Sequence, residues 1–124
     1  MLHSTLNFGT FINIKRKEQG VTQKNIAEAL GVTTVYICDI EKNRRYPPTK
    51  GDMLTKLASI LKLNENEQSL LYDLAGYDKG CVSPDLSEYI MSSELVRSAL
   101  RKARDKATTD DWKWFIDNLE KKQK

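Results

Sequence analysis

The side chains best suited to chemistry in this sequence are hydrogen-bond donors and cations between residues 22 and 50. Gln23 follows Thr22, a good helix cap, so Gln23 stands at the start of an expected helix. Free backbone N–H groups and the positive end of the helix dipole attract a phosphate there, and the Gln23 amide adds a donor. The same stretch contains several cations, among them Lys24, Arg44, Arg45 and Lys50. This combination is suited to binding a polyanion such as DNA.

The chain has a net charge of +3, and the basic excess lies in its first part. Residues 1–50 contain 8 Lys and Arg against 4 Asp and Glu, whereas residues 51–124 are close to neutral. A small basic face suits DNA, but an ordinary solvated surface has the same composition. The charge alone therefore does not decide between these two interpretations.

The residues that other chemistries need are absent or badly spaced. His3 is the one histidine, and the two cysteines, Cys38 and Cys81, are far apart in the sequence. This excludes a Cys/His zinc cluster and catalysis by a well-placed imidazole. We therefore expect no metal, no cofactor and no enzymatic activity, and we interpret Asp110 and Asp111 as charges that favour a helix start.

Length and composition favour one small folded domain with a short appendage. The 124 residues are 40% hydrophobic and 30% charged, which argues against wholesale disorder. No apolar run approaches the ~20 residues of a membrane span, and the N-terminal segment lacks the pattern of a signal peptide. Two lone cysteines suggest reduced thiols, so we expect a cytoplasmic protein that does not bind a membrane.

Apolar periodicity predicts helices almost throughout and no strands, so the expected fold class is all-α. Five helices are predicted in the first part, over residues 8–19, 23–30, 34–42, 51–61 and 65–75. The residues expected to end helices are Gly20, Gly31, Asn43 and Gly76. Pro47 and Pro48 cannot continue a helix, so they predict an extended loop.

The helical signal lapses at residues 77–83, and a new helical region begins at Pro84. Apolar stripes continue past an expected break at Ser92 and Ser93, and a last helix is expected from about residue 108. These observations predict a domain over residues 1–78, a linker over 79–84 and a helical C-terminal region over 85–124. The C-terminal region is too short for a core of its own, so its apolar residues must pack on the first domain or on a second copy.

Two short helices joined by a three-residue turn with a glycine form a helix-turn-helix unit. The residues that carry this motif are Thr22-Gln23, Ile26-Ala27, Leu30-Gly31-Val32-Thr33, Tyr36-Ile37, Ile40-Glu41, Asn43 and Pro47. They resemble the Cro/repressor-type (xenobiotic-response-element-like) helix-turn-helix family over about residues 5–76. The resemblance implies a five-helix, lambda-repressor-like DNA-binding domain, followed by a small helical extension. Its third helix, about residues 33–42, would enter the major groove of double-stranded DNA.

The resemblance also assigns roles to individual residues. At positions that contact base edges it places Thr34, Val35 and Asp39. Nearer the DNA backbone it places Thr33 and Tyr36, and the expected phosphate contacts come from Gln23, Lys24, Arg44, Arg45 and Lys50. An ion pair that ties the first helix to the third is expected between Arg16 and Glu41.

The set of base-reading residues departs from the usual one, because it lacks the paired Gln or Arg that bind a base through two hydrogen bonds. Val35 would touch a thymine methyl group, and Thr34 would donate or accept a hydrogen bond. Asp39 would accept from cytosine but repel a nearby phosphate. Tyr36 is interpreted as a surface residue, with packing against a neighbouring helix as the alternative.

DNA-binding proteins of this kind commonly act as dimers on two half-sites. We therefore expect the C-terminal region to form a homodimer interface, with the candidate residues Leu95, Leu100, Trp112, Phe115, Ile116 and Leu119. The alternative is that these residues pack within one chain.

The leading hypothesis is a sequence-specific DNA-binding transcriptional regulator, expected to be a repressor. One alternative is the antitoxin of a toxin–antitoxin pair, which a disordered tail would favour, whereas this C-terminus looks folded. Another is a protein-interaction module that no longer touches DNA, and the basic residues near the third helix argue against it. An effector, if there is one, would be a partner protein or a small molecule in a modest cleft.

Overall fold

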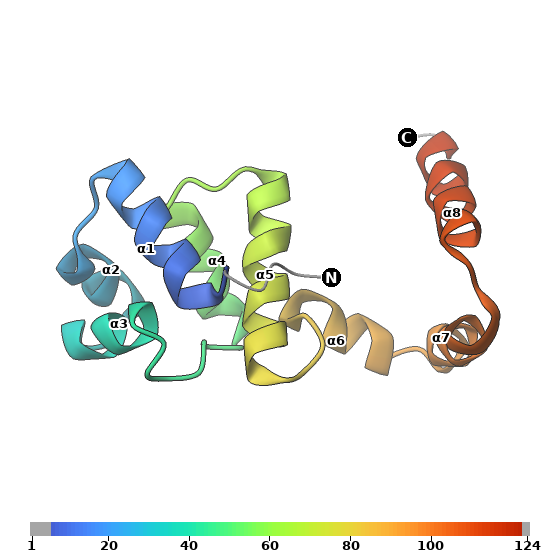
Figure 1. Cartoon of the computed structure of the whole chain (residues 1–124), viewed down its shortest axis with the longest axis horizontal. Helices are drawn as coiled ribbons and strands as arrows, with labels where there is room; N and C mark the ends of the chain where they lie inside the picture. The colour runs from blue at the N-terminus through green and yellow to red at the C-terminus, as the bar shows by residue number, and fades with distance from the viewer. Residues whose placement is uncertain (1–5, 123–124) are drawn as a thin grey trace. The chain divides into compact units, whose positions relative to one another are not determined.

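The chain folds into helices over residues 6–122, the part that this computed structural model describes. Figure 1 shows the eight helices of that part, which contains no strand, so the all-α class is confirmed. The chain divides into two compact units, Met1–Ser87 and Glu88–Lys124. The first unit contains α1 (Phe8–Gln19), α2 (Gln23–Leu30), α3 (Thr34–Glu41), α4 (Gly51–Ile60) and α5 (Glu65–Lys79). The boundary falls within α6 (Pro84–Met91), and the second unit continues with α7 (Glu94–Lys106) and α8 (Thr109–Lys121).

Polar side chains bound the first three helices. Asn7 accepts a hydrogen bond from the Thr10 N–H at the start of α1, and Thr22 and Asn25 form a reciprocal capping box at the start of α2. Asn43, two residues after α3, has a φ of 61°, which confirms the left-handed residue expected there. These residues satisfy or redirect the backbone groups that a helix end leaves without partners.

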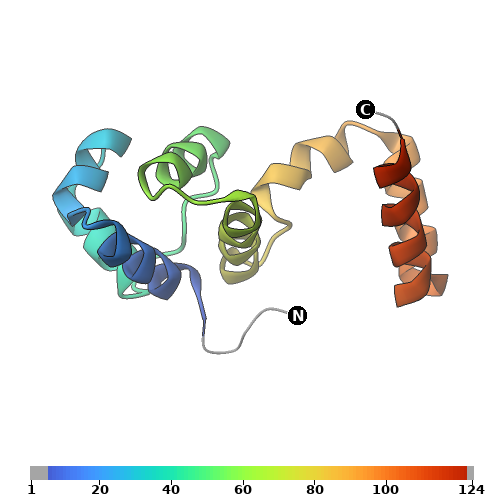
Figure 2. The same ribbon diagram turned by 90° about the horizontal axis from the view of Figure 1, so that it is seen from above.

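Apolar side chains from α1 to α5 form one core in the first unit. The largest side chains that are completely buried are Phe8, Ile12, Ile26, Leu54, Leu61, Leu71 and Leu74. Burial of such a side chain contributes about 1.5–3 kcal/mol to stability. α2 packs on α3 at one end of this unit, while α1 packs on both α3 and α5 (Figures 1 and 2). The core thereby determines how α2 and α3 cross.

The expected end of the fifth helix at Gly76 is wrong, because α5 continues to Lys79 and ends at Gly80, which has a φ of 81°. Gly76 instead allows the following loop to fold back against the helix. A Cβ at this position would lie 2.8 Å from the Cys81 carbonyl oxygen and 2.9 Å from the Ser83 Cα. The glycine is needed because the backbone of the following loop passes close to the helix. A local sequence pattern does not distinguish this role from that of a helix stop.

We expect Gly76→Ala to lower the free energy of unfolding by about 1–3 kcal/mol, the usual cost of overpacking. The neighbouring atoms belong to the backbone, so the loop over residues 81–83 must shift to make room. Urea denaturation of the two proteins measures the difference. An unchanged midpoint would show that this loop moves freely, contrary to the packing described.

The two long helices of the second unit, α7 and α8, contain no buried residue. Ser93 caps α7 and Thr108 caps α8, which confirms the expected break before residue 94 and the expected start of the last helix. Apolar side chains remain exposed on both helices, including Leu95 at 81% and Trp114 at 67%. These helices therefore lack the apolar burial that stabilises the first unit.

Candidate nucleic-acid interface

The turn between α2 and α3 is built on a glycine and two buried helix faces. Gly31 has a φ of 73°, a conformation that other residues adopt only with strain, and its N–H donates to the Ala27 carbonyl. Ala27 is buried where the two helices meet, and Ile37 and Ile40 anchor α3 to the core. One face of α3 is thus held inward, and the opposite face is left at the surface.

The exposed part of α3 and its cap carries most of the residues expected to read bases. Thr33 and Thr34 are exposed, and Val35 is 67% exposed. Thr33 also caps the helix, since its side chain accepts a hydrogen bond from the Tyr36 N–H. Asp39 is partly buried on the same helix. These positions offer a short polar and apolar surface that fits the major groove, which admits one α-helix.

Asp39 is paired with a cation of the following loop. The Arg44 guanidinium lies 3.8 Å from the Asp39 carboxylate, and the Arg44 N–H donates to the Asp39 carbonyl at 2.8 Å. A long, partly exposed pair of this kind contributes little to stability. The pair matters more for binding than for stability, because Arg44 offsets the repulsion that Asp39 would exert on a phosphate.

Tyr36 is neither a free surface residue nor a fully packed one. Its side chain is half-buried against the core, and its ring lies under the Arg45 guanidinium, with 4.8 Å from the ring centroid to Cζ. A cation over an aromatic face is attracted by the ring. Both interpretations of Tyr36 therefore hold in part, and the ring restrains Arg45 beside α3.

The Gln23 amide, which is expected to bind a phosphate, also makes a hydrogen bond within the chain. Its Nε2 atom donates to the Glu41 carboxylate at 2.9 Å, so the side chain turns toward the interior. In the capping box, the backbone N–H of Asn25 donates to the Thr22 hydroxyl oxygen. Lys24 remains exposed there, and Lys50 is exposed just before α4.

Glu41 is a buried carboxylate that joins three helices. It accepts hydrogen bonds from Asn13 at 2.8 Å, from Arg16 at 2.6 and 3.1 Å, and from Gln23 at 2.9 Å. Arg16 also donates to the Val21 carbonyl, so the ion pair expected with Glu41 extends to the loop before α2. Burial acts to raise the pKa of Glu41, but the hydrogen bonds from Arg16, Asn13 and Gln23 outweigh it and hold that pKa below its ordinary value.

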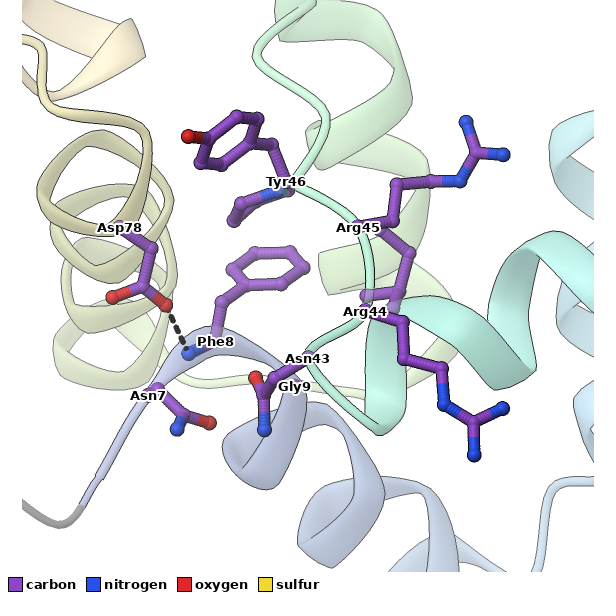
Figure 3. A pocket seen from close by; sticks show the side chains of 10 residues that line it. Asn7, Phe8, Gly9, Asn43, Arg44, Arg45, Tyr46 and Asp78 are labelled. Carbon is purple, nitrogen blue, oxygen red and sulfur yellow. Dashed lines mark hydrogen bonds between the residues drawn. The ribbon is translucent and has the colours of Figure 1, made fainter.

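An open pocket of about 580 Å³ lies where the loop after α3 meets the start of α1. Figure 3 shows Asp78 on one side of it, where its carboxylate accepts the Phe8 N–H at 2.8 Å. The Arg44 and Arg45 guanidinium groups extend from the other side, away from Asp78 (Figure 3). The start of α1, Asp78 of α5 and the loop after α3 thus line one pocket, and the two arginine side chains of the loop project away from it.

Several of these supporting residues were not found from the sequence. Asn13 joins the Glu41 cluster, Asp78 holds the start of α1, and Lys79 lies over the Tyr46 ring. Asn13 precedes Arg16 by about one helical turn, so a shared helix face was an available signal. Asp78 and Phe8 are 70 residues apart, and no local pattern connects them.

Within residues 6–122, no group of three or more His, Cys, Asp or Glu residues is placed to hold a metal ion. His3 lies outside the described residues. No helix formed by the described residues is long and apolar enough to cross a membrane.

Comparison with known proteins bears on the same segment. A family model described as helix-turn-helix matches residues 12–68, from α1 into α5. The ImmF control region 10 kDa protein of Bacillus phage phi105 is 35% identical over 75 residues, which are 57% of this chain and 81% of that protein. No solved structure matched the chain. The matched family segment contains α2, the turn, α3 and the two arginines that follow it.

Proposed function

Because this chain belongs to the Cro/repressor-type helix-turn-helix family and is a DNA-binding regulator, we propose that it is a sequence-specific repressor. In this proposal α3 enters the major groove of an operator. The observation that carries it is the exposed face of α3 beside two outward cations, Arg44 and Arg45. A relative that is named for the control region of a phage supports a role in regulation.

The residues divide into base contacts and backbone contacts. Thr34, Val35 and Asp39 face base edges, and Thr33 lies beside them at the start of α3. The phosphate contacts come from Lys24, Arg44, Arg45 and Lys50, while Tyr36 positions Arg45. Gln23 contributes indirectly, since its bond to Glu41 ties the start of α2 to the end of α3.

We also propose that the protein forms a homodimer and acts in the cytoplasm. Residues 1–78 bind DNA, residues 79–84 link the parts, and residues 85–124 hold two copies together. The exposed apolar residues of α7 and α8 support this, because a second copy would remove them from water. Two half-sites bound together also multiply a weak single contact.

The arginine contacts predict a specific change in salt dependence. Each of Arg44→Gln and Arg45→Gln should weaken DNA binding on all sequences. Each should also make the negative slope of log K against log salt less steep, by about 1. Fluorescence anisotropy with a labelled duplex over a salt series measures both quantities. Arg101→Gln on α7 is the matched control, because it removes the same charge from an exposed position of the second unit.

The control should leave the slope within error of the wild-type value. If Arg101→Gln reduced the steepness of the slope as much as Arg44→Gln, binding would depend on total charge and not on the loop after α3. If neither arginine variant changed the slope, the proposed DNA-binding face would be wrong.

A further inference from the structure

The apolar faces of α7 and α8 differ in the size of their side chains. With about 3.6 residues per turn, the small residues Ala99, Ala103 and Ala107 share one face of α7 and its C-cap with Val96 and Leu100. The corresponding face of α8 carries large side chains, which are Trp112, Phe115, Ile116 and Leu119. Large side chains of one helix fill the space over small ones of another, so α7 is better matched to α8 than to itself.

The charges of the two helices are also complementary. α7 contains five basic and two acidic residues and is net +3, whereas α8 contains four acidic and two basic residues and is net −2. Lys102 and Arg104 flank the apolar face of α7 on opposite sides. Asp111 and Glu120 flank that of α8, where Lys113 also lies. Opposite charges beside an apolar seam favour pairing of unlike helices and oppose pairing of like ones.

Neither of these complementary faces is buried within one chain. α7 and α8 bury no residue, and no ion pair links them in the described part of the chain. Only Ala107 and Thr108 separate the two helices, and both have extended backbone conformations. The ion pair of this region joins Arg104 to its neighbour Asp105, and both side chains are exposed.

We propose that α7 of one copy packs on α8 of a second copy, and that the contact occurs twice about a two-fold axis. This inference rests on the homodimer of the proposed function and specifies which helices meet in it. In a two-fold dimer each copy presents the same surface, so α7 and α8 of each chain are both used. The Ala face receives the Trp112 and Phe115 rings, and the cationic and anionic margins align.

Two charge variants of the full chain test this arrangement. The α7 variant carries Lys102→Glu and Arg104→Glu, and the α8 variant carries Asn118→Lys and Glu120→Lys. Each alone places like charges across both contacts, so its dimer dissociation constant should rise roughly tenfold or more at low salt. Mixed in equal amounts, the two should form a heterodimer, because opposite charges then meet at both contacts. Sedimentation velocity without DNA, with one variant fluorescently labelled, measures the result.

Several results would overturn the proposal. A monomeric wild-type chain would do so, and so would variants that each dimerise as tightly as the wild type. If one chain carrying all four substitutions recovers stability but the mixture forms no heterodimer, α7 and α8 pair within a chain. Failure here is separate from failure of the DNA-binding proposal, because the salt dependence of the Arg44 and Arg45 variants is measured independently. Circular dichroism of each variant shows that the helices remain formed.

Discussion

Gly9→Ala is expected to lower the free energy of unfolding by about 3 kcal/mol, the upper end of the usual cost of overpacking. Gly9 lies on α1 where that helix crosses the end of α3. A Cβ there would collide with the Ile40 carbonyl oxygen and lie 2.9 Å from the Glu41 carbonyl oxygen. Both atoms belong to the helix that carries the proposed base contacts, so α3 must move to accept the methyl group.

Gly51→Ala is the matched control for this prediction. Gly51 is the first residue of α4, and a Cβ there would meet no atom within 4 Å. Alanine restricts the unfolded chain and favours the helix, so we expect a gain of about 0.4–1 kcal/mol. Urea denaturation followed by circular dichroism gives both values. Equal stability of the Gly9→Ala protein and the wild type would contradict the close packing of α1 on α3.

Glu41→Ala is expected to cost about 3–5 kcal/mol, because it leaves a partner of a buried ion pair without its counter-charge. The Glu41 side chain is 2% exposed and that of Arg16 is 14% exposed, so water does not replace the lost bonds. Asn13 and Gln23 lose their acceptor as well. The same denaturation experiment measures the effect.

Glu28→Ala on α2 is the control, since Glu28 is exposed and the same side chain is removed. We expect its effect to stay within about 0.5 kcal/mol. Comparable losses for the two variants would show that the Glu41 cluster contributes no more than a surface carboxylate. The central position of Glu41 among three helices would then be irrelevant to stability.

The lowered pKa of Glu41 predicts how this loss depends on pH. The unfolded chain binds a proton to Glu41 more readily than the folded chain does, so this contribution to stability is fully present above the unfolded pKa. It is lost as the pH falls from about 4.3 through the lower folded pKa. The stability gap between the wild type and Glu41→Ala should therefore be wide at pH 7 and narrow in stronger acid. A constant gap down to acid pH would contradict the assignment.

Much of the first unit could be predicted from local signals. The helix caps, the glycine turn at Gly31 and the apolar spacing of Ile37 and Ile40 are encoded within a few residues, so the α2–turn–α3 unit was expected, with the end of α3 one residue later than observed. The Arg16–Glu41 pair came from the family resemblance, and the structure contains it at 2.6 Å. The residue positions that read DNA stay predictions.

The tertiary uses of individual residues could not be predicted in the same way. Gly76 resembles a helix stop, but it accommodates a loop that folds back from residues 81–83. The Gln23 amide looks free at a helix start, but it is drawn to a carboxylate 18 residues away. Both outcomes depend on which surfaces meet in three dimensions, and neither helix periodicity nor capping preference contains that information.

Selection of bound duplexes from a random library at near-physiological salt tests the central proposal most directly. The wild-type chain should enrich an inverted repeat whose half-sites lie about one helical turn apart. A parallel selection with Thr34→Ala and Val35→Ala combined should enrich a motif with relaxed preference at the positions they contact, while Arg101→Gln should enrich the wild-type motif. No enrichment by the wild type, with only salt-sensitive binding to all duplexes, would contradict a sequence-specific regulator.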